Sequence, residues 1–233
     1  MNKFVPKIKF DFGNYLPFIA DFRLNLIFKF KEDKSQFREQ QLLSKYVLSE
    51  KRVGVYLEID CYQPILYSNS YLLKYLWRGI SVDANKSVLL QWRLFRPRNR
   101  IIIAAVTTQP YMKFIEYFKY PRRHAVLNST NKQFLENWKG PNLKTSLKLV
   151  KAVDINYLYE STLKEFGAID LLLLDVEGED FSLLQTLLSK IMIYPKWLLV
   201  EDHETSIDDL TEKYGYYLVD SSGPSKLFAR EVL

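Results

Sequence analysis

The sequence predicts an α/β fold, a doubly wound and mostly parallel sheet that ends in an antiparallel C-terminal hairpin. Short apolar runs alternate along the chain with segments of helical periodicity, as expected for parallel strands joined by crossover helices. One run, Leu171–Leu174, is apolar without alternation, which is typical of a central strand covered on both faces. Only residues 220–225 join the last two predicted strands, too few for a crossover helix, so these strands must form a hairpin.

Periodicity places the individual elements. The predicted strands are Val55–Ile59, Gly79–Asp83, Arg100–Val106, Leu171–Asp175, Trp197–Val200, Tyr216–Val219 and Lys226–Ala229. The predicted helices are Ser35–Glu50, Ser70–Trp77, Val88–Phe95, Phe181–Lys190 and Ile207–Tyr214, with Ser35 as a possible N-cap of the first. Between residues 107 and 148, four proline and glycine residues break the pattern into loops and short helices, and no element can be assigned there.

Length and composition favour one globular domain. The chain has 233 residues, of which 48% are hydrophobic and 26% charged. We expect an N-terminal basic and aromatic extension with a helix in residues 1–50 and one domain in residues 51–233. A single cysteine, Cys61, excludes a disulfide framework and favours a reducing compartment. No run is long enough to cross a membrane and no signal-peptide core is visible, so we expect a soluble, cytoplasmic protein.

The net charge of +6 is concentrated toward the N-terminus. Residues 1–31 contain Asp11 and Asp21 as their only acids, against Lys3, Lys7, Lys9, Arg23, Lys29 and Lys31. Because this segment is also rich in aromatic residues, it could touch an anionic membrane surface or a partner. The plainer interpretation is an extension packed on its own domain with solvated lysines.

The predicted strands end on acids, and in doubly wound sheets ligands bind at the carboxyl ends of strands. Asp83 ends the second strand, where a carboxylate can accept hydrogen bonds from both hydroxyls of an adenosine ribose. The plainer role for Asp83 is a cap of the next helix. Asp175 and Glu177 follow the central strand and could orient a cofactor and a substrate hydroxyl, or ligate a divalent cation with Glu201 or Asp202, although no metal is expected.

His203 and Glu201 end the next strand and are candidates for a general base, together with Glu177. His203 could equally be an exposed loop residue. A basic, aromatic stretch lies in the middle of the chain and could bind nucleic acid or an acidic glycan, but a solvated face is the plainer interpretation and no RNA-recognition motif is present. The cations of this stretch are Arg93, Arg96, Arg98, Arg100, Lys113, Lys119, Arg122, Arg123 and His124.

An ordered set of segments resembles the FkbM-type family of S-adenosylmethionine-dependent methyltransferases. The matching segments are Tyr56–Pro64, Tyr67–Tyr71, Trp77–Asn85, Arg96–Asn99, Ile169–Leu171, Asp175–Gly178, Pro195–Glu201 and Gly215–Tyr216. The resemblance implies a class I, Rossmann-like methyltransferase fold, the cofactor S-adenosylmethionine and methyl transfer to an oxygen, often a sugar hydroxyl in glycan or natural-product biosynthesis. It implies a small-molecule or glycan substrate rather than nucleic acid.

The resemblance also implies a set of cofactor-binding residues. These are Glu58, Asp60, Cys61, Tyr62, Gln63, Ser68, Asn69, Asp83, Ala84, Asn85 and Asp175. One position departs from the family pattern, because Asp60 stands where the first loop usually has glycine. A carboxylate there would crowd and repel the carboxylate of the cofactor. The rival hypothesis is therefore a degenerate methyltransferase fold that serves as a binding or scaffolding module.

Overall fold

The computed structural model describes residues 15–120, 127–137, 145–202 and 207–231. Its main sheet has seven strands in the order β3-β2-β1-β7-β8-β10-β9. Six of them run in one direction, and β10 runs in the opposite direction between β8 and β9. The strands are β1 (Val55–Ile59), β2 (Arg78–Asp83), β3 (Arg100–Ile103), β7 (Leu171–Leu174), β8 (Trp197–Glu201), β9 (Tyr216–Ser222) and β10 (Ser225–Arg230). This order and the C-terminal hairpin define the class I methyltransferase fold, which confirms the predicted fold class.

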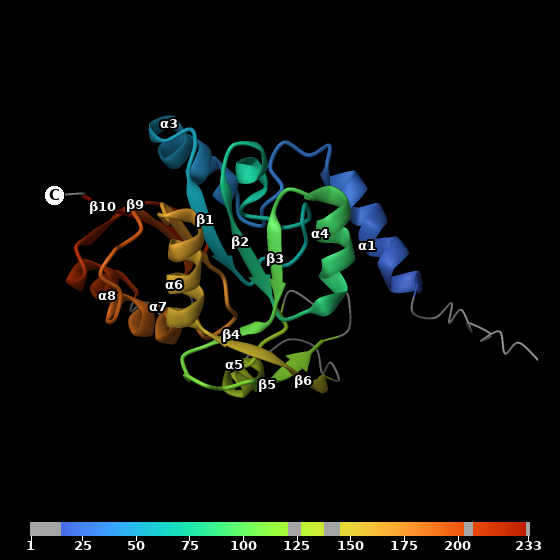
Figure 1. The fold of residues 1–233 in the computed structure, drawn as a ribbon. Coiled ribbons are helices and arrows are strands. Elements are labelled where there is room, and N and C mark those ends of the chain that lie inside the picture. Colours follow the sequence, from blue (N-terminus) through green and yellow to red (C-terminus); the bar gives the residue numbers. More distant parts are fainter. Residues whose placement is uncertain (1–14, 121–126, 138–144, 203–206, 232–233) are drawn as a thin grey trace, which may run out of the picture.

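Helices cover both faces of this sheet (Figure 1). The α-helices are α1 (Tyr15–Phe28), α2 (Glu39–Leu42), α3 (Leu48–Glu50), α4 (Leu89–Phe95), α5 (Lys132–Asn137), α6 (Ile155–Phe166), α7 (Asp180–Leu188) and α8 (Ile207–Lys213). A π-helical turn, η2 (Leu43–Val47), links α2 to α3, and 3₁₀ turns η3 (Tyr71–Tyr75) and η4 (Lys86–Val88) precede β2 and α4. Among the described residues, none of these helices has the length and apolarity needed to cross a membrane.

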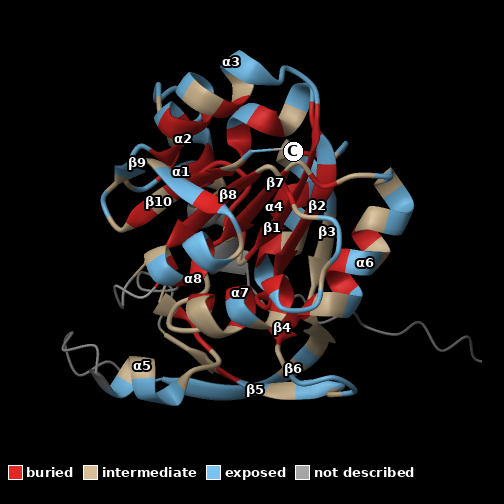
Figure 2. Cartoon of the chain, turned by 90° about the vertical axis from the view of Figure 1, so that its left-hand side faces the viewer, coloured by how far each residue is buried: buried red, intermediate tan, exposed pale blue. Residues whose placement is uncertain are grey.

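The core divides into two layers, one on each face of the sheet. Side chains of α6, α7 and α8 pack on one face against alternate residues of the strands, such as Leu57 and Leu172. Residues of α2 and η2, among them Leu43, pack on the opposite face against Leu171 and Leu173. Figure 2 shows the buried strands between these layers. The central strands are therefore shielded on both sides, as the unbroken apolar run predicts. The predicted boundary at residue 50 stays a prediction.

A second sheet corrects the prediction of a single one. Its three strands, in the order β4-β6-β5, are β4 (Ala105–Thr107), β5 (Phe114–Lys119) and β6 (Ser146–Asp154). The predicted strand Arg100–Val106 is wrong in extent, because the chain leaves the main sheet after Ile103 and continues in the small sheet. The small sheet lies beyond the carboxyl ends of the main strands (Figure 1).

Three helix predictions need correction. The first helix begins at Glu39 instead of Ser35, since Arg38 adopts a left-handed conformation with φ 71° just before it. Ser35 is no N-cap, although its hydroxyl accepts a hydrogen bond from the Gln40 amide. Residues 70–77 form a single 3₁₀ turn, η3, and helices α1 and α6 lie where no helix is predicted.

Candidate functional site

The carboxyl ends of β1, β2 and β7 meet where the strand order reverses, between β1 and β7. Four predicted acids, Asp60, Asp83, Asp175 and Glu177, come together there, because parallel neighbouring strands end at the same edge. The pocket holds about 30 Å³ of free space, which is room for one or two water molecules. Its lining residues are Gln36, Asp60, Tyr62, Tyr67, Asp83, Asn85, Tyr117, Asn128, Asp175 and Glu177.

Asp83 is held rigidly at the end of β2. Its Oδ2 accepts a hydrogen bond from the Tyr62 amide at 2.8 Å, and its Oδ1 accepts one from the Asn85 amide at 2.6 Å. Burial raises the pKa of this carboxyl to about 7, in spite of those bonds and the nearby charge of Lys119. Asp83 therefore connects the loop after β1 to the loop after β2, and its ribose-binding role stays a prediction.

Asp60 follows β1 with φ 61°, in the left-handed region that favours glycine. Its side chain shares a hydrogen bond with Asp83. Burial raises the pKa of Asp60 well above its ordinary value, and the charges of Asp83 and Asp175 raise it further. Two carboxyl groups in contact hold a proton between them, so we describe Asp60 and Asp83 as one carboxyl pair.

Asp175, Glu177 and Glu201 form a second acidic group at the ends of β7 and β8. One oxygen from each lies within 4.8 Å of the others, and Glu201 shares a hydrogen bond with Asp175. Burial raises the pKa of Glu201 to about 7, which suits a proton acceptor at neutral pH. Three carboxylate oxygens at this spacing also have the chemistry to ligate a hard divalent cation.

Asn69 connects the first loop to this acidic group. Its Nδ2 donates a hydrogen bond to Asp175 Oδ2 at 3.3 Å. Its Oδ1 is buried and has no hydrogen-bond partner among the described residues. A buried acceptor without a partner is costly, so a ligand with an N–H or O–H donor beside Asp175 would be stabilised there.

Four predicted cofactor residues, Glu58, Cys61, Gln63 and Ser68, lie beneath the pocket and do not line it. Glu58 Oε2 accepts hydrogen bonds from the hydroxyls of Ser70 and Ser81, at 2.7 and 2.6 Å. Ser68 accepts from the Arg96 guanidinium, Gln63 accepts from Asn25, and Cys61 packs against Val88 and Trp92. Their described contacts are with the protein, so direct contact with a cofactor stays a prediction for these four.

A larger groove adjoins the pocket on the side of the small sheet. It holds about 540 Å³ and is lined by Ala84, Lys86, Ile103, Phe114, Tyr117, Lys119, Lys148, Leu149, Val150 and Lys151. Lys119 donates a hydrogen bond to Asn85 Oδ1 at 2.8 Å. Burial lowers the pKa of Lys119, and Lys86 and Lys148 lower it further. The groove is thus apolar and cationic, in contrast to the acidic pocket beside it.

The sequence pattern does not predict Tyr117 and Asn128, which line the pocket from β5 and from the segment after it. Both lie in the region without predicted elements. The mostly aromatic and apolar residues along 114–118 favour a strand around Tyr117 but do not say where it docks, and no pattern marks Asn128. The predicted base His203 lies outside the described residues.

No protein-family model matches the sequence, and no curated protein matches it. Several solved structures are similar. A methyltransferase from Geobacter sulfurreducens is 9% identical, with a TM-score of 0.45 over 97% of this chain and 100% of that one. A TehB-like SAM-dependent methyltransferase from Corynebacterium glutamicum is 8% identical, with a TM-score of 0.43 over 95% and 100%.

A third similar structure is the 1,6-didemethyltoxoflavin-N1-methyltransferase from Burkholderia thailandensis, with its substrate and S-adenosylhomocysteine bound. It is 10% identical, with a TM-score of 0.38 over 98% of this chain and 90% of that one. TM-scores this low say nothing about the ligand of the present chain. Its fold class follows from its own strand order and hairpin.

Proposed function

We propose that this chain is an S-adenosylmethionine-dependent O-methyltransferase that acts on a sugar hydroxyl, as its resemblance to the FkbM-type family implies. One observation carries the proposal. Asp83 at the end of β2 and the pair Glu177 and Glu201 beyond it converge at the point where the strand order reverses. The first supplies an anchor for a ribose, and the other two supply acceptors for a substrate proton.

The residues present suit the charge of this cofactor. When bound, S-adenosylmethionine supplies a methyl group on a positively charged sulfur. The acids around the pocket favour that charge, and the orphaned Asn69 Oδ1 beside Asp175 is an acceptor for the ammonium group. Ala84 and Ile103 line the adjoining groove, whose 540 Å³ are large enough for a nucleoside.

Glu201 is the base that the geometry favours. A sugar hydroxyl must give up its proton as its oxygen attacks the methyl carbon, and a group with a pKa near 7 can accept that proton at neutral pH. The hydrogen bond between Glu201 and Asp175 orients the Glu201 carboxyl. Glu177 would then position the hydroxyl. Most of the rate enhancement would come from holding nucleophile and methyl group in line.

Calorimetric titration with S-adenosylhomocysteine tests the cofactor part of the proposal. Transfer of a labelled methyl group to a panel of sugars and glycan precursors tests the acceptor part. Glu201→Gln should lower kcat by about 10²–10⁴-fold, because the proton acceptor is lost. It should also abolish the rise in rate through about pH 7. Glu212→Gln, an exposed glutamate of α8, is the matched control and should leave the rate unchanged.

The scaffolding alternative rests on Asp60 and on the narrow pocket. The resemblance places the amino-acid part of the cofactor beside the loop that holds Asp60, and the pocket that Asp60 lines has a free volume of only about 30 Å³. Failure of millimolar S-adenosylhomocysteine to shift the melting temperature would favour this alternative. A rate abolished by EDTA and restored by magnesium would instead favour a cation on Asp175, Glu177 and Glu201.

A further inference from the structure

The outer side of α1 and of the turn that follows it is apolar and exposed. Phe30 is 87% exposed and Ile27 is 61% exposed, and Leu24 and Leu26 are also exposed. The only charged residues of the helix are Asp21 and Arg23, so α1 has no charged face to turn toward solvent. Large exposed apolar patches on one element are unusual and mark an interaction site.

The hydrogen bonds of one buried asparagine fix α1 in this orientation. Asn25 is fully buried, and its Nδ2 donates hydrogen bonds to Gln63 and Gln91, while its Oδ1 accepts from the amides of Ile65 and Leu66. Because Asn25 can satisfy these groups only from one side of the helix, the opposite side must face outward. The side chain of Ile27 is therefore exposed because Asn25 holds the other side of α1 against the domain.

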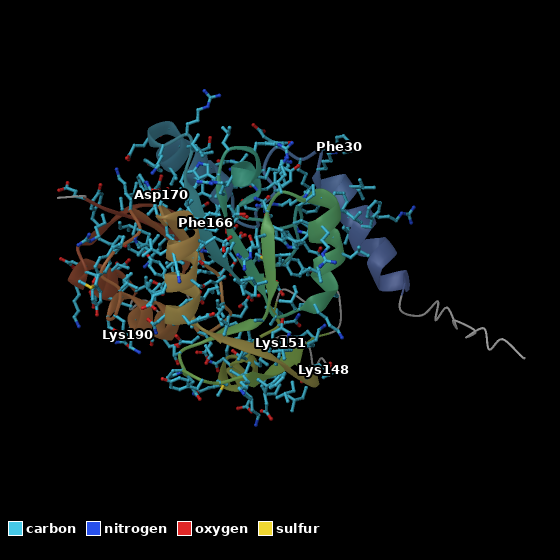
Figure 3. All side chains as sticks on the ribbon, in the orientation of Figure 1. Phe30, Lys148, Lys151, Phe166, Asp170 and Lys190 are labelled. Carbon is cyan, nitrogen blue, oxygen red and sulfur yellow. The ribbon has the colours of Figure 1, made fainter. Side chains whose placement is uncertain are left out.

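Helix α4 extends the patch. Phe22 of α1 contacts Phe95 of α4, with ring centroids 5.2 Å apart, and the Asn25–Gln91 hydrogen bond of 2.6 Å joins the same two helices. The two helices stand beside each other at the edge of the molecule, and Phe30 lies at the end of α1 (Figure 3). On α4, Leu90 is 51% and Leu94 54% exposed, one helical turn apart.

The charges of this α1–α4 face, residues 22–31 and 89–98, are all positive. Neither segment contains an aspartate or a glutamate. The exposed cations are Arg23, Lys29, Lys31, Arg93 and Arg98. Asp21 and Glu32 border the first segment, so cations are in excess around this face but are not the only charges there. Exposed apolar side chains among an excess of cations are the pattern that binds the surface of an anionic bilayer.

We propose that the α1–α4 face docks on an anionic membrane surface. Phe30 and Ile27 enter the boundary between headgroups and acyl chains, and the cations lie at the level of the lipid phosphates. A second copy of the chain fits less well, because a two-fold contact would bring Arg23, Lys29 and Arg93 against their own counterparts. The proposal is independent of the reaction that the pocket carries out.

Co-sedimentation of the full chain with vesicles tests this docking. We expect binding to phosphatidylcholine vesicles that contain phosphatidylserine, weaker binding to pure phosphatidylcholine, and release by salt. Replacing Ile27→Ser and Phe30→Ser together should weaken binding by about tenfold or more, since both side chains leave the bilayer. The matched control replaces Met192→Ser and Ile193→Ser, which are 93% and 56% exposed on the far side of the sheet, and should bind like the natural chain.

The charge contribution has its own pair of variants. Lys29→Gln with Lys31→Gln should weaken binding to the anionic vesicles and leave the residual binding to neutral vesicles unchanged. Lys164→Gln with Lys190→Gln removes two exposed lysines elsewhere and should change neither. Equal loss in both lysine pairs would overturn the proposal, as would absence of binding by the natural chain. Dimerisation that Ile27→Ser abolishes, measured by light scattering, would assign the face to a second copy.

Discussion

Glu58 and Asp60 lie two residues apart at the end of β1, and their surroundings differ completely. Glu58 accepts hydrogen bonds from Ser70 and Ser81, and Ser70 in turn accepts one from Arg96 at 2.8 Å. Burial raises the pKa of Glu58, and Arg96 and the hydroxyls counteract that effect. For Asp60, the largest contributions after burial come from other acids, and all of them raise its pKa.

The difference separates a carboxyl group whose charge is balanced within the fold from one whose charge is not. The contacts of Glu58 are complete within the fold, so no ligand is needed to stabilise it. The charges of Asp83, Asp175 and Glu177 raise the pKa of Asp60, which destabilises its charged form until a proton or a positively charged ligand joins it. The sequence shows only that Asp60 departs from the family pattern and Glu58 does not. The neighbours in the fold show which of the two carboxyl groups has partners of opposite charge.

Removing the cation of the structural network should give the largest effect on stability. Arg96→Met leaves Glu58 buried without its guanidinium, and breaking a buried charge network in this way costs about 3–5 kcal/mol of unfolding free energy. Urea denaturation measures the change. Arg93→Met, at an exposed position of α4, the helix that Arg96 directly follows, is the matched control and should cost less than about 0.5 kcal/mol.

Adding Glu58→Gln to Arg96→Met should recover part of that loss, because the unpaired charge is then gone. A single Arg96→Met variant as stable as the natural chain would show that the network contributes nothing and would remove the contrast with Asp60.

The acidic pocket predicts how stability depends on pH. The pKa values of Asp83 and Glu201 are raised to about 7 in the folded chain, above their ordinary 3.8 and 4.5. Between those limits the folded chain holds protons that the unfolded chain has released, so stability must fall as pH rises from about 4 to about 7. Asp83 alone contributes up to about 4 kcal/mol over this range, at about 1.4 kcal/mol per unit.

Urea midpoints measured at intervals across this pH range test the prediction. Asp83→Asn should flatten the fall, because one of the titrating groups is gone. A midpoint that rises with pH in the natural chain would mean that folding lowers the pKa values of these carboxyl groups, and would contradict the prediction.

Most of the main sheet could be predicted from the sequence, because strands covered on both faces are unbroken apolar runs. Leu171–Leu174 is the clearest case. The small sheet could not be predicted in the same way. Leu147 and Leu149 of β6 are apolar but exposed, so the apolar positions of this strand do not mark a buried face. Helix α1 escaped prediction for a related reason: its apolar residues occur on both the docked and the exposed side, so they show no helical period.

The site divides in the same way. The acids at strand ends were predictable because parallel strands bring their carboxyl ends to one edge, which places Asp83 and Asp175 in one pocket. The hydrogen bond between Asp60 and Asp83 was not predictable, because Asp60 adopts a left-handed backbone conformation that the sequence does not reveal. Nor does any spacing reveal that Arg96 contacts Ser70 from the far end of α4.

Asp83→Ala tests the functional half of the comparison. We expect it to weaken binding of S-adenosylhomocysteine by about 1.5–3 kcal/mol, the usual loss of hydrogen bonds to a charged group. Calorimetry measures this. Asp170→Ala is the matched control, because Asp170 also accepts a backbone amide, that of Val55, at the opposite edge of the sheet (Figure 3). It should lower stability and leave affinity intact, and equal affinities in both variants would remove Asp83 from the site.

Asp60→Gly gives the smallest expected effect and decides between an active and a degenerate site. Glycine relieves the left-handed conformation at φ 61°, which should stabilise the fold by about 1 kcal/mol. If the Asp60 carboxylate faces the carboxylate of the cofactor, its removal should also tighten S-adenosylhomocysteine binding at least tenfold, or about 1.4 kcal/mol.

Asp60→Asn separates charge from backbone in that experiment, because asparagine removes the charge, keeps the size and tolerates the left-handed region. Tighter binding in both variants would assign the repulsion to the carboxylate. Looser binding in both would mean that Asp60 accepts a hydrogen bond from the cofactor's ammonium group, which makes it part of an active site. Unchanged affinity in both, with a natural chain that binds tightly, would mean that the shared proton with Asp83 already neutralises Asp60. In that case a proton balances the negative charge of the Asp60–Asp83 pair, as the Arg96 guanidinium balances that of Glu58.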